Sequence, residues 1–292
     1  MKGQPFYLVD VFAEEEYTGN QLAVFPDAGE LSVDEMLQLA WEMHYSETTF
    51  ITGSQQPEGG FPVRIFTPQE ELPFAGHPTL GTAFVVREYL MDDPPDEVVL
   101  NLGVGQIPVN FEKKSGALWM TQRRPEFGEI IDRERVAKAL NLSPNDFHAD
   151  YPVQSVSTGI PFLIAPLTSL EAVQECGLNY EYYPTSLDGL DTKAILIFAP
   201  ETIEADNDLH ARVFAEYYGV SEDPATGSAN GCLAAYLSYH TYFGRDDINV
   251  RVEQGYEIHR PSLLHLRTKI QDEKIVVQVG GNVIPVARGN LL

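Results

Sequence analysis

Cysteine is scarce in this sequence, which contains only two, Cys176 and Cys232, among 292 residues. They share no CxxC spacing, so the sequence excludes a disulfide framework and argues against a structural zinc site. The seven histidines show no HxH or HxxxH spacing, which leaves little basis for a bound metal ion. We therefore expect a chain that works without a metal.

Long hydrophobic runs are also missing. None approaches the ~18–20 residues that a membrane-spanning helix needs. The first residues, MKGQPFYLVDVF, contain no apolar segment followed by a cleavage site, so no signal peptide is expected. By elimination, the sequence predicts a cytoplasmic protein without a membrane partner.

Positive charge is the third scarcity, because 19 Lys and Arg face 43 Asp and Glu, for a formal net charge of −24. Such a surface repels the phosphates of nucleic acids and anionic membranes, so neither is expected as a partner. An anionic small substrate has to be captured by local hydrogen-bond donors against this field. The acidity itself can serve solubility alone.

Cofactor signatures are absent too. No GxGxxG follows a predicted strand and opens a helix, and the segment LGVGQIP (102–108) lacks both the third glycine and the helix. The few lysines lie in polar stretches rather than in the buried setting that a pyridoxal enzyme needs. We expect no flavin, nicotinamide or pyridoxal cofactor.

What the sequence does contain is two similarly composed halves. Each has several β-like segments, one amphipathic helix and one helix that is apolar on most faces. The amphipathic helices are expected at 32–44, where Ser32 and Glu35 have capping-box spacing, and at 208–218. The length favours two domains, which we place at 1–125 and 126–292. A return of the last strand to the first domain is an open alternative.

The apolar helices begin with related sequences. HPTLGTA (77–83) overlies DPATGSA (223–229) at an offset of 146 residues, and proline, glycine and alanine coincide. Each segment follows an acidic loop and opens an apolar helix, which has to be surrounded, for instance by a sheet curled around it. The chain is therefore expected to form two pseudo-symmetric α+β domains, each a sheet wrapped around a buried helix.

The starts of these helices are candidate binding sites. We expect His77 and Asp223 at the N-cap positions, each followed by proline at the first helical position. Free N–H groups and a partial positive charge at a helix start attract anions. If the two domains face each other, both helix starts can hold a carboxylate, and His77 and Asp223 can transfer or orient protons. Alternatively, both residues merely cap their helices.

Six motifs occur in an order that resembles the PhzF-like, phenazine-biosynthesis family over nearly the whole chain: VDVFAEEEYTGNQLAVF, SETTFI, FAGHPTLGTAFVV, VSTGIPFLIAP, EDPATGSANGCLAAYL and EQGYEIHRPS. This family is similar in fold to diaminopimelate epimerase. The resemblance implies an α+β fold of two pseudo-symmetric domains, each a barrel-like, mostly antiparallel sheet around a central helix.

The resemblance also implies the site residues. Glu47 matches the general acid/base, with His77 and Asp223 as further catalytic residues and Ser228 beside the substrate. Gly76 and Gly227 would let the backbone approach the substrate closely. From the sequence alone, Glu47 looks like a solvated side chain between a helix and a strand.

Two further features bear on the resemblance. The cysteine pair of the epimerase is missing, and Cys232 lies further along its helix, where packing explains it better than catalysis. The family's usual glycine in EQGxxxGRPS is His259 here, a residue we expect to point to solvent.

The function that the resemblance implies is a cofactor-independent isomerase or epimerase. It would move a proton on a small carboxylic acid, with Glu47 as general acid/base in an interdomain cleft of a homodimeric enzyme. Two alternatives stay open: a two-base racemase or epimerase that uses Glu47 and Asp223, and a non-catalytic protein that binds a small ligand.

Overall fold

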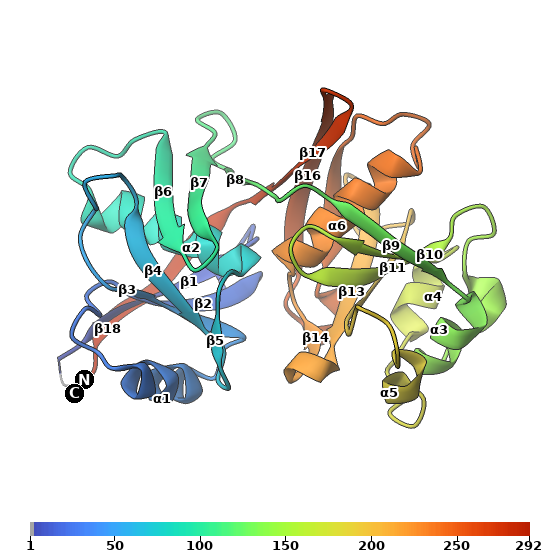
Figure 1. Cartoon of the computed structure of the whole chain (residues 1–292), viewed down its shortest axis with the longest axis horizontal. Coiled ribbons are helices and arrows are strands. Elements are labelled where there is room, and N and C mark those ends of the chain that lie inside the picture. The colour runs from blue at the N-terminus through green and yellow to red at the C-terminus, as the bar shows by residue number, and fades with distance from the viewer. Residues whose placement is uncertain (1–2) are drawn as a thin grey trace. The chain divides into compact units, whose positions relative to one another are not determined.

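The computed structural model describes residues 3–292, which form two compact units (Figure 1). Unit 1 comprises residues 3–121 and 280–292, and unit 2 comprises residues 122–279. The first unit therefore contains both ends of the described chain. The division into domains at residues 125 and 126 stays a prediction, since compactness does not show that either part folds alone.

Unit 1 is a curved sheet with mostly antiparallel neighbours. β1 pairs with β2 and β18, β3 with β4, β4 with β5, and β6 with β7, all antiparallel, whereas β2–β3 and β4–β6 are parallel. Its strands are β1 (Pro5–Val11), β2 (Asn20–Phe25), β3 (Glu47–Ile51), β4 (Phe61–Phe66), β5 (Glu71–Leu72), β6 (Glu97–Leu102), β7 (Gly105–Phe111), β8 (Leu118–Thr121) and β18 (Val283–Asn290).

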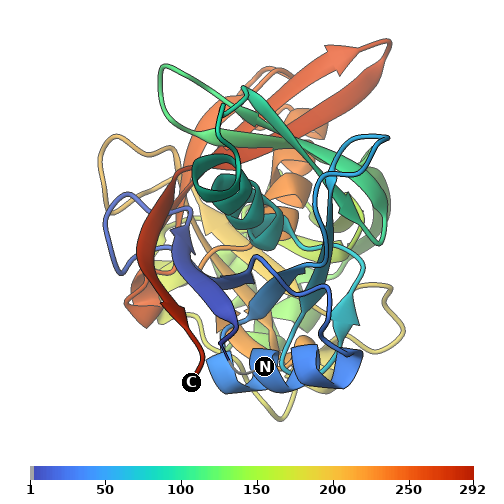
Figure 2. The same cartoon turned by 90° about the vertical axis from the view of Figure 1, so that its left-hand side faces the viewer.

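The helix α2 (Gly76–Val85) lies inside this sheet and contacts β1, β2, β3, β6, β7, β8 and β18 (Figure 2). Nine of its ten residues are buried, which agrees with the expected apolar helix in a curled sheet. After Val85 the chain continues as a π-helical turn, η1 (Val86–Leu90).

The helix α1 (Val33–Met43) packs on the other face of the same sheet. Ser32 caps it, and the expected capping box is present, with the Glu35 amide donating to the Ser32 hydroxyl and the Ser32 amide to the Glu35 carboxylate. The amphipathic helix predicted at 32–44 is thus confirmed. Its buried side, Met36, Leu39 and Ala40, joins a core that includes Phe25, Phe50 and Phe66.

Unit 2 has the same kind of architecture. The pairs β9–β10, β10–β11, β12–β13, β13–β14 and β15–β16 are antiparallel, and β11–β12 and β13–β15 are parallel. Its strands are β9 (Glu126–Ile131), β10 (Val153–Ser157), β11 (Pro161–Pro166), β12 (Ile195–Ala199), β13 (Leu209–Ala215), β14 (Val220–Asp223), β15 (Asn249–Gln254), β16 (Ser262–Gln271) and β17 (Lys274–Gly281).

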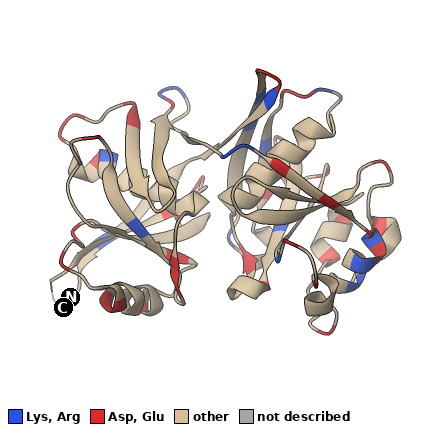
Figure 3. Ribbon diagram, in the orientation of Figure 1, with Lys and Arg blue, Asp and Glu red and all other residues tan. Residues whose placement is uncertain are grey.

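The buried helix of unit 2 is α6 (Gly227–Tyr239), which contacts β10, β11 and β16. Both α2 and α6 are free of charged residues (Figure 3). An uncharged helix can be enclosed on most sides without the large cost of burying unpaired charges. This explains how the two least polar helices of a strongly acidic chain come to lie inside their sheets.

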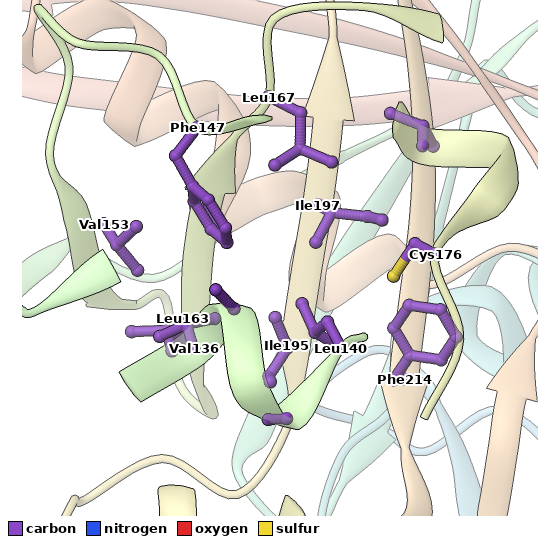
Figure 4. Packing of buried hydrophobic residues seen from close by; sticks show 14 of the residues in the cluster. Val136, Leu140, Phe147, Val153, Leu163, Leu167, Cys176, Ile195, Ile197 and Phe214 are labelled. Carbon is purple, nitrogen blue, oxygen red and sulfur yellow. The ribbon is translucent and has the colours of Figure 1, made fainter. Parts of the chain in front are cut away.

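A second core covers the outer face of the unit 2 sheet. Val136 and Leu140 from the α3 region face Leu163, Ile195 and Phe214 of the strands (Figure 4). The strand β12 is thereby buried on both faces, which accounts for its unbroken apolar sequence ILIFA. The helices here are α3 (Arg133–Ala139), α4 (Leu170–Glu175) and α5 (Tyr183–Ser186), with the 3₁₀ turns η2 (Pro144–Asp146), η3 (Glu216–Tyr218) and η4 (Tyr256–Ile258).

The amphipathic helix predicted at 208–218 is wrong. Residues 209–215 form the strand β13, followed by the turn η3. His210 and Arg212 of this strand are both buried and paired with carboxylates. They alternate with Leu209, Ala211 and Val213, which is the periodicity of a strand.

The predicted helix starts also need correction. The N-cap of α2 is Ala75 and that of α6 is Thr226, so neither His77 nor Asp223 is an N-cap. The first N–H groups of a helix have no partner within it, so proline is tolerated at each position of the first turn. Pro78 is the third residue of α2 and did not mark the first. The two helices begin at Gly76 and Gly227, an offset of 151 residues rather than 146.

Candidate active site

Glu47 opens β3, the strand that lies beside β2 in the sheet of unit 1. In the parallel register of these strands Glu47 is opposite Leu22. Its side chain is 17% exposed, so it is mostly removed from water. The solvated position that the sequence alone suggested is therefore wrong.

His77 is the second residue of α2, and its ring lies beside Glu47. The imidazole Nε2 is 3.5 Å from Oε2 of Glu47, and the side chain is 4% exposed. The ring also hydrogen-bonds to the backbone of Gln21. Because Nε2 makes no hydrogen bond within the described residues, this bond uses Nδ1.

Burial is the main influence on the charge of His77. It lowers the pKa of the imidazole to about 3, although the hydrogen bond to Gln21 acts in the opposite direction. The ring is therefore neutral at physiological pH. Its single proton sits on Nδ1, which donates to the Gln21 carbonyl, and Nε2 presents a lone pair towards Glu47.

Buried threonines fix the helix that carries His77 to the strand that carries Glu47. The Thr82 hydroxyl of α2 donates to the Thr49 hydroxyl of β3 at 2.8 Å, and both side chains are buried.

Gly19, immediately before β2, has a φ of +69°, and a Cβ there would lie 2.5 Å from the carbonyl oxygen of Val11. Only glycine fits this approach, which places the first residues of β2 beside the pair.

Sequence reasoning missed Gln21 because its contribution is a backbone carbonyl, which leaves no signature in residue type. The available signal was the TGN motif before β2, whose glycine indicates a constrained backbone.

In unit 2, Asp223 is the last residue of β14 and is 8% exposed. Its Oδ2 accepts a hydrogen bond from the Thr226 hydroxyl at 2.5 Å. Its backbone carbonyl accepts one from Nε2 of the fully buried Gln254 at 2.7 Å. The carboxylate thus belongs to an ordered loop between β14 and α6.

The other predicted site residues lie at the helix starts. Gly76 is the first residue of α2, and Gly227 and Ser228 are the first two of α6; all three are buried. Within the described residues, neither Ala75 nor Thr226 makes a side-chain capping hydrogen bond. The first-turn N–H groups are therefore left for another acceptor, such as a carboxylate.

Cys232 and His259 lie as expected. Cys232 is fully buried in α6, and burial raises the pKa of its thiol to about 11. Such a thiol is a packing group rather than a nucleophile at neutral pH. His259 is exposed and ends η4 with a φ of 59°, a left-handed conformation that suits the glycine usual at this position.

Across residues 3–292, no group of three His, Cys, Asp or Glu side chains could hold a metal ion. Nor is any helix in this range long and apolar enough to cross a membrane.

A comparison with protein families matches residues 9–289 to the phenazine biosynthesis-like protein family, PhzC-PhzF. The chain belongs to this family. Among its relatives, an uncharacterized isomerase of Clostridium acetobutylicum is 32% identical over 294 residues, covering 98% of this chain and 97% of the relative. The trans-2,3-dihydro-3-hydroxyanthranilate isomerase of Pseudomonas aeruginosa is 33% identical over 290 residues, covering 97% and 98%.

The fold is shared with solved PhzF structures. A Bacillus anthracis phenazine biosynthesis protein of the PhzF family superposes with a TM-score of 0.92 at 27% identity, and each chain is covered completely. This confirms the expected α+β fold, and a hydroxyproline epimerase of Agrobacterium vitis shares the fold at a TM-score of 0.59 and 11% identity, as expected of an epimerase-like fold. Together with the relatives, the shared PhzF fold identifies the chain as a PhzF-like isomerase.

Proposed function

We propose that this PhzF-like isomerase moves a proton between two carbons of a small carboxylic acid, with Glu47 as the general acid/base and without a cofactor. The observation that carries the proposal is the mostly buried Glu47 carboxyl, 3.5 Å from a buried, neutral imidazole. A proton-transfer group held on a strand beside a fixed imidazole that can accept its proton in a hydrogen bond is an arrangement suited to such catalysis.

The state of His77 determines what it does for Glu47. A carboxylate oxygen facing the Nε2 lone pair is repelled, whereas a protonated carboxyl can donate to it. When the Glu47 carboxylate takes a proton from one substrate carbon, His77 therefore stabilises the resulting acid. The same proton then returns to a second carbon, so that the product is an isomer and Glu47 regains its starting state.

Each helix start, that of α2 in unit 1 and that of α6 in unit 2, is by itself a candidate site for a carboxylate of the substrate. The N–H groups of Gly76, Gly227 and Ser228 lie in uncapped first turns, where the helix dipole adds a partial positive charge. No Lys or Arg is then required, in keeping with the scarcity of both in this chain. Asp223 would be a second polar group on the reacting part of the substrate.

The first compound to assay is trans-2,3-dihydro-3-hydroxyanthranilate, a small carboxylic acid for which the Pseudomonas aeruginosa relative is named. With an accepted substrate, Glu47→Gln keeps the shape of the side chain but removes its acid/base capacity. We expect turnover to fall by about 100-fold or more. Glu42→Gln, an exposed glutamate of α1, is the matched control and should retain full activity. Undiminished turnover in Glu47→Gln would refute the assignment.

Deuterium labelling separates the proposed reaction from a two-base racemase. If one carboxyl group moves the proton, it can return the substrate's own hydrogen to the product. A substrate deuterated at the donor carbon then keeps part of its deuterium in the product when the reaction runs in H₂O. A racemase that uses Glu47 and Asp223 exchanges the α-proton of both enantiomers with solvent. Light scattering on the same sample tests the proposed homodimer.

A further inference from the structure

A cluster of charged side chains lies buried in unit 2, and none of its members has a role in the proposed proton transfer. It contains two cations and three carboxylates, from His210, Arg212, Glu222, Glu253 and Glu257. His210 and Glu253 are fully buried. Buried charges are stable only when their pairing and hydrogen-bond geometry compensate for the loss of water, so such a cluster constrains the segments that carry it.

His210 of β13 links two of the carboxylates. Its Nδ1 is 3.0 Å from Oε1 of Glu253 on β15, and its Nε2 is 2.9 Å from Oε1 of Glu257 on η4. Only an imidazolium can donate from both nitrogens. Burial lowers the pKa of the ring, but the hydrogen bonds to the two carboxylates outweigh it and raise the pKa to about 8.

The other charged or titratable groups around His210 come from each neighbouring element. Tyr256 of η4 lies with its ring centroid 5.8 Å from the imidazole. In the loop before β13, the amide of Glu204 and the side chain of Asn207 donate to Glu253 at 3.2 and 2.9 Å. On β13 itself, Arg212 Nε lies 3.8 Å from Oε2 of Glu257. The carboxylates of Glu253 and Glu257 thus place negative charge on both sides of the ring, and the positive charge of the imidazolium compensates for it.

This cluster holds the loop between β14 and α6 from one side through Arg212. The guanidinium donates from Nε and Nη2 to the Glu222 carboxylate at 2.9 and 2.8 Å. Glu222 immediately precedes Asp223, so this two-bond contact fixes the end of β14.

It holds the loop from the other side through Gln254, which follows Glu253 at the end of β15. The Gln254 amide donates to the Asp223 carbonyl at 2.7 Å, and its oxygen accepts from the Thr226 amide at 3.4 Å and from the Asn230 side chain at 2.8 Å. One buried side chain thus ties the loop to the first turn of α6.

The turn after Gln254 also packs directly on this loop. Gly255 has a φ of +80°, and a Cβ there would lie 2.6 Å from the carbonyl oxygen of Pro224. Glu257 is two residues further along, in η4. The contacts of His210 with Glu253 and Glu257 therefore bracket the segment that supports the start of α6.

We propose that His210, in its protonated form, is a positioning residue that holds this turn in place and thereby orders the Asp223–Thr226 loop. The catalytic meaning of that loop rests on the proposed function, but its ordering does not. A neutral His210 can donate to only one carboxylate and presents a lone pair to the other, so its deprotonation loosens the turn.

Hydrogen exchange followed by mass spectrometry tests this without a substrate. The peptide to follow spans 222–231, where the Asn230 amide bonds to the Thr226 carbonyl. After correction for the intrinsic pH dependence of exchange, we expect its opening equilibrium to rise between pH 6.5 and 9. The limit is about 30-fold, if opening returns His210 from a pKa of about 8 to its ordinary 6.5. Peptides from α2 and α3 should show no such step.

Variants sharpen the test. His210→Gln should exchange faster in 222–231 already at pH 6.5 and lose the pH step, whereas His259→Gln, an exposed histidine of the same unit, should behave as the wild type. Adding Glu257→Gln to His210→Gln removes one of the opposing carboxylates and should restore part of the protection. That rescue distinguishes charge balance from simple loss of packing.

A flat pH profile of the 222–231 peptide in the wild type would overturn the proposal. So would a pH step of equal size in the α2 and α3 peptides, which would indicate global loosening. If the expected exchange is found while Asp223→Asn keeps full turnover, the positioning role stands and the proposed catalytic use of Asp223 falls.

Discussion

The Nε2 atom of His77 lies 3.5 Å from Oε2 of Glu47, while the other ring nitrogen is committed to the backbone of Gln21. The imidazole is neutral because it is buried, so it faces the carboxyl as a hydrogen-bond acceptor. The pair is therefore suited to hold one proton, and His77 acts on the protonated form of Glu47.

Replacing His77 by asparagine tests this relationship. His77→Asn removes the acceptor that faces Glu47, and we expect turnover on an accepted substrate to fall by about 10- to 100-fold. The loss should appear in kcat more than in KM, because the contact matters when Glu47 carries the proton. His44→Asn, at the exposed end of α1, is the control. A loss confined to KM would instead assign His77 to substrate binding.

The two buried histidines should give the protein a stability maximum near pH 6.5, the ordinary pKa of both. Below this pH, His77 takes up a proton in the unfolded chain but not in the folded one, so stability falls as the pH falls, which forms the acid limb of the profile. Burial also lowers the pKa of His240, which adds to the acid limb. Above pH 6.5, His210 loses its proton in the unfolded chain but keeps it up to about pH 8 in the folded one. Stability therefore falls as the pH rises, which forms the alkaline limb. The second effect amounts to ~2 kcal/mol.

Urea unfolding at pH 5, 6.5 and 8.5 measures both limbs. His77→Asn should flatten the acid limb and leave the alkaline one, whereas His210→Gln should do the reverse. The interpretation fails if each variant retains the wild-type slope on its own side of the maximum.

Gly81 of α2 lies against side chains of β1 and β2 in the surrounding sheet. A Cβ at this position would lie 2.6 Å from the Leu22 Cδ2 atom and 2.8 Å from the Val11 Cγ2 atom. We expect Gly81→Ala to lower the free energy of unfolding by about 1–3 kcal/mol, despite alanine's better helix propensity. Gly177→Ala is the matched control, since nothing lies within 4 Å of the added carbon. Equal thermal stability of the two variants would contradict this packing.

His259 offers a stabilising substitution. A residue with a side chain at a φ of 59° costs about 1–2 kcal/mol, and the greater freedom of glycine in the unfolded chain offsets roughly 0.5–1 kcal/mol of the relief. We expect His259→Gly to raise the free energy of unfolding by about 0.5 kcal/mol. Glu171→Gly, at an exposed helical position of α4, should lower it by about 1 kcal/mol. A loss of stability in His259→Gly would reveal a contact of the side chain.

Local signals made part of the fold predictable. The capping box of α1 is satisfied within four consecutive residues, so its sequence is sufficient to identify the start of that helix. The apolar residues that cover most faces of α2 and α6 likewise indicated enclosed helices. Their exact starts were not predictable from proline, because Pro78 is the third residue of α2 whereas Pro224 lies before α6, two residues ahead of its N-cap Thr226.

Tertiary pairing explains what the sequence could not show. His210 and Arg212 look like a solvated helix face until Glu253, Glu257 and Glu222 are brought to them by other strands. Glu47 was identified only through the family resemblance, since nothing beside it in the sequence indicates burial. The support from Gln21 and Gln254 depends on backbone atoms that meet only in the folded chain.

The pairing of β18 with β1 has a consequence for synthesis on the ribosome. Strand β18 comes from residues 283–290, yet it lies in register with residues 5–11. The sheet around α2 therefore cannot be completed until the chain has been made as far as residue 290, whereas residues 122–279 of unit 2 are contiguous. Such distant contacts slow folding, and an emerging chain would leave the β1 edge exposed as a target for chaperones.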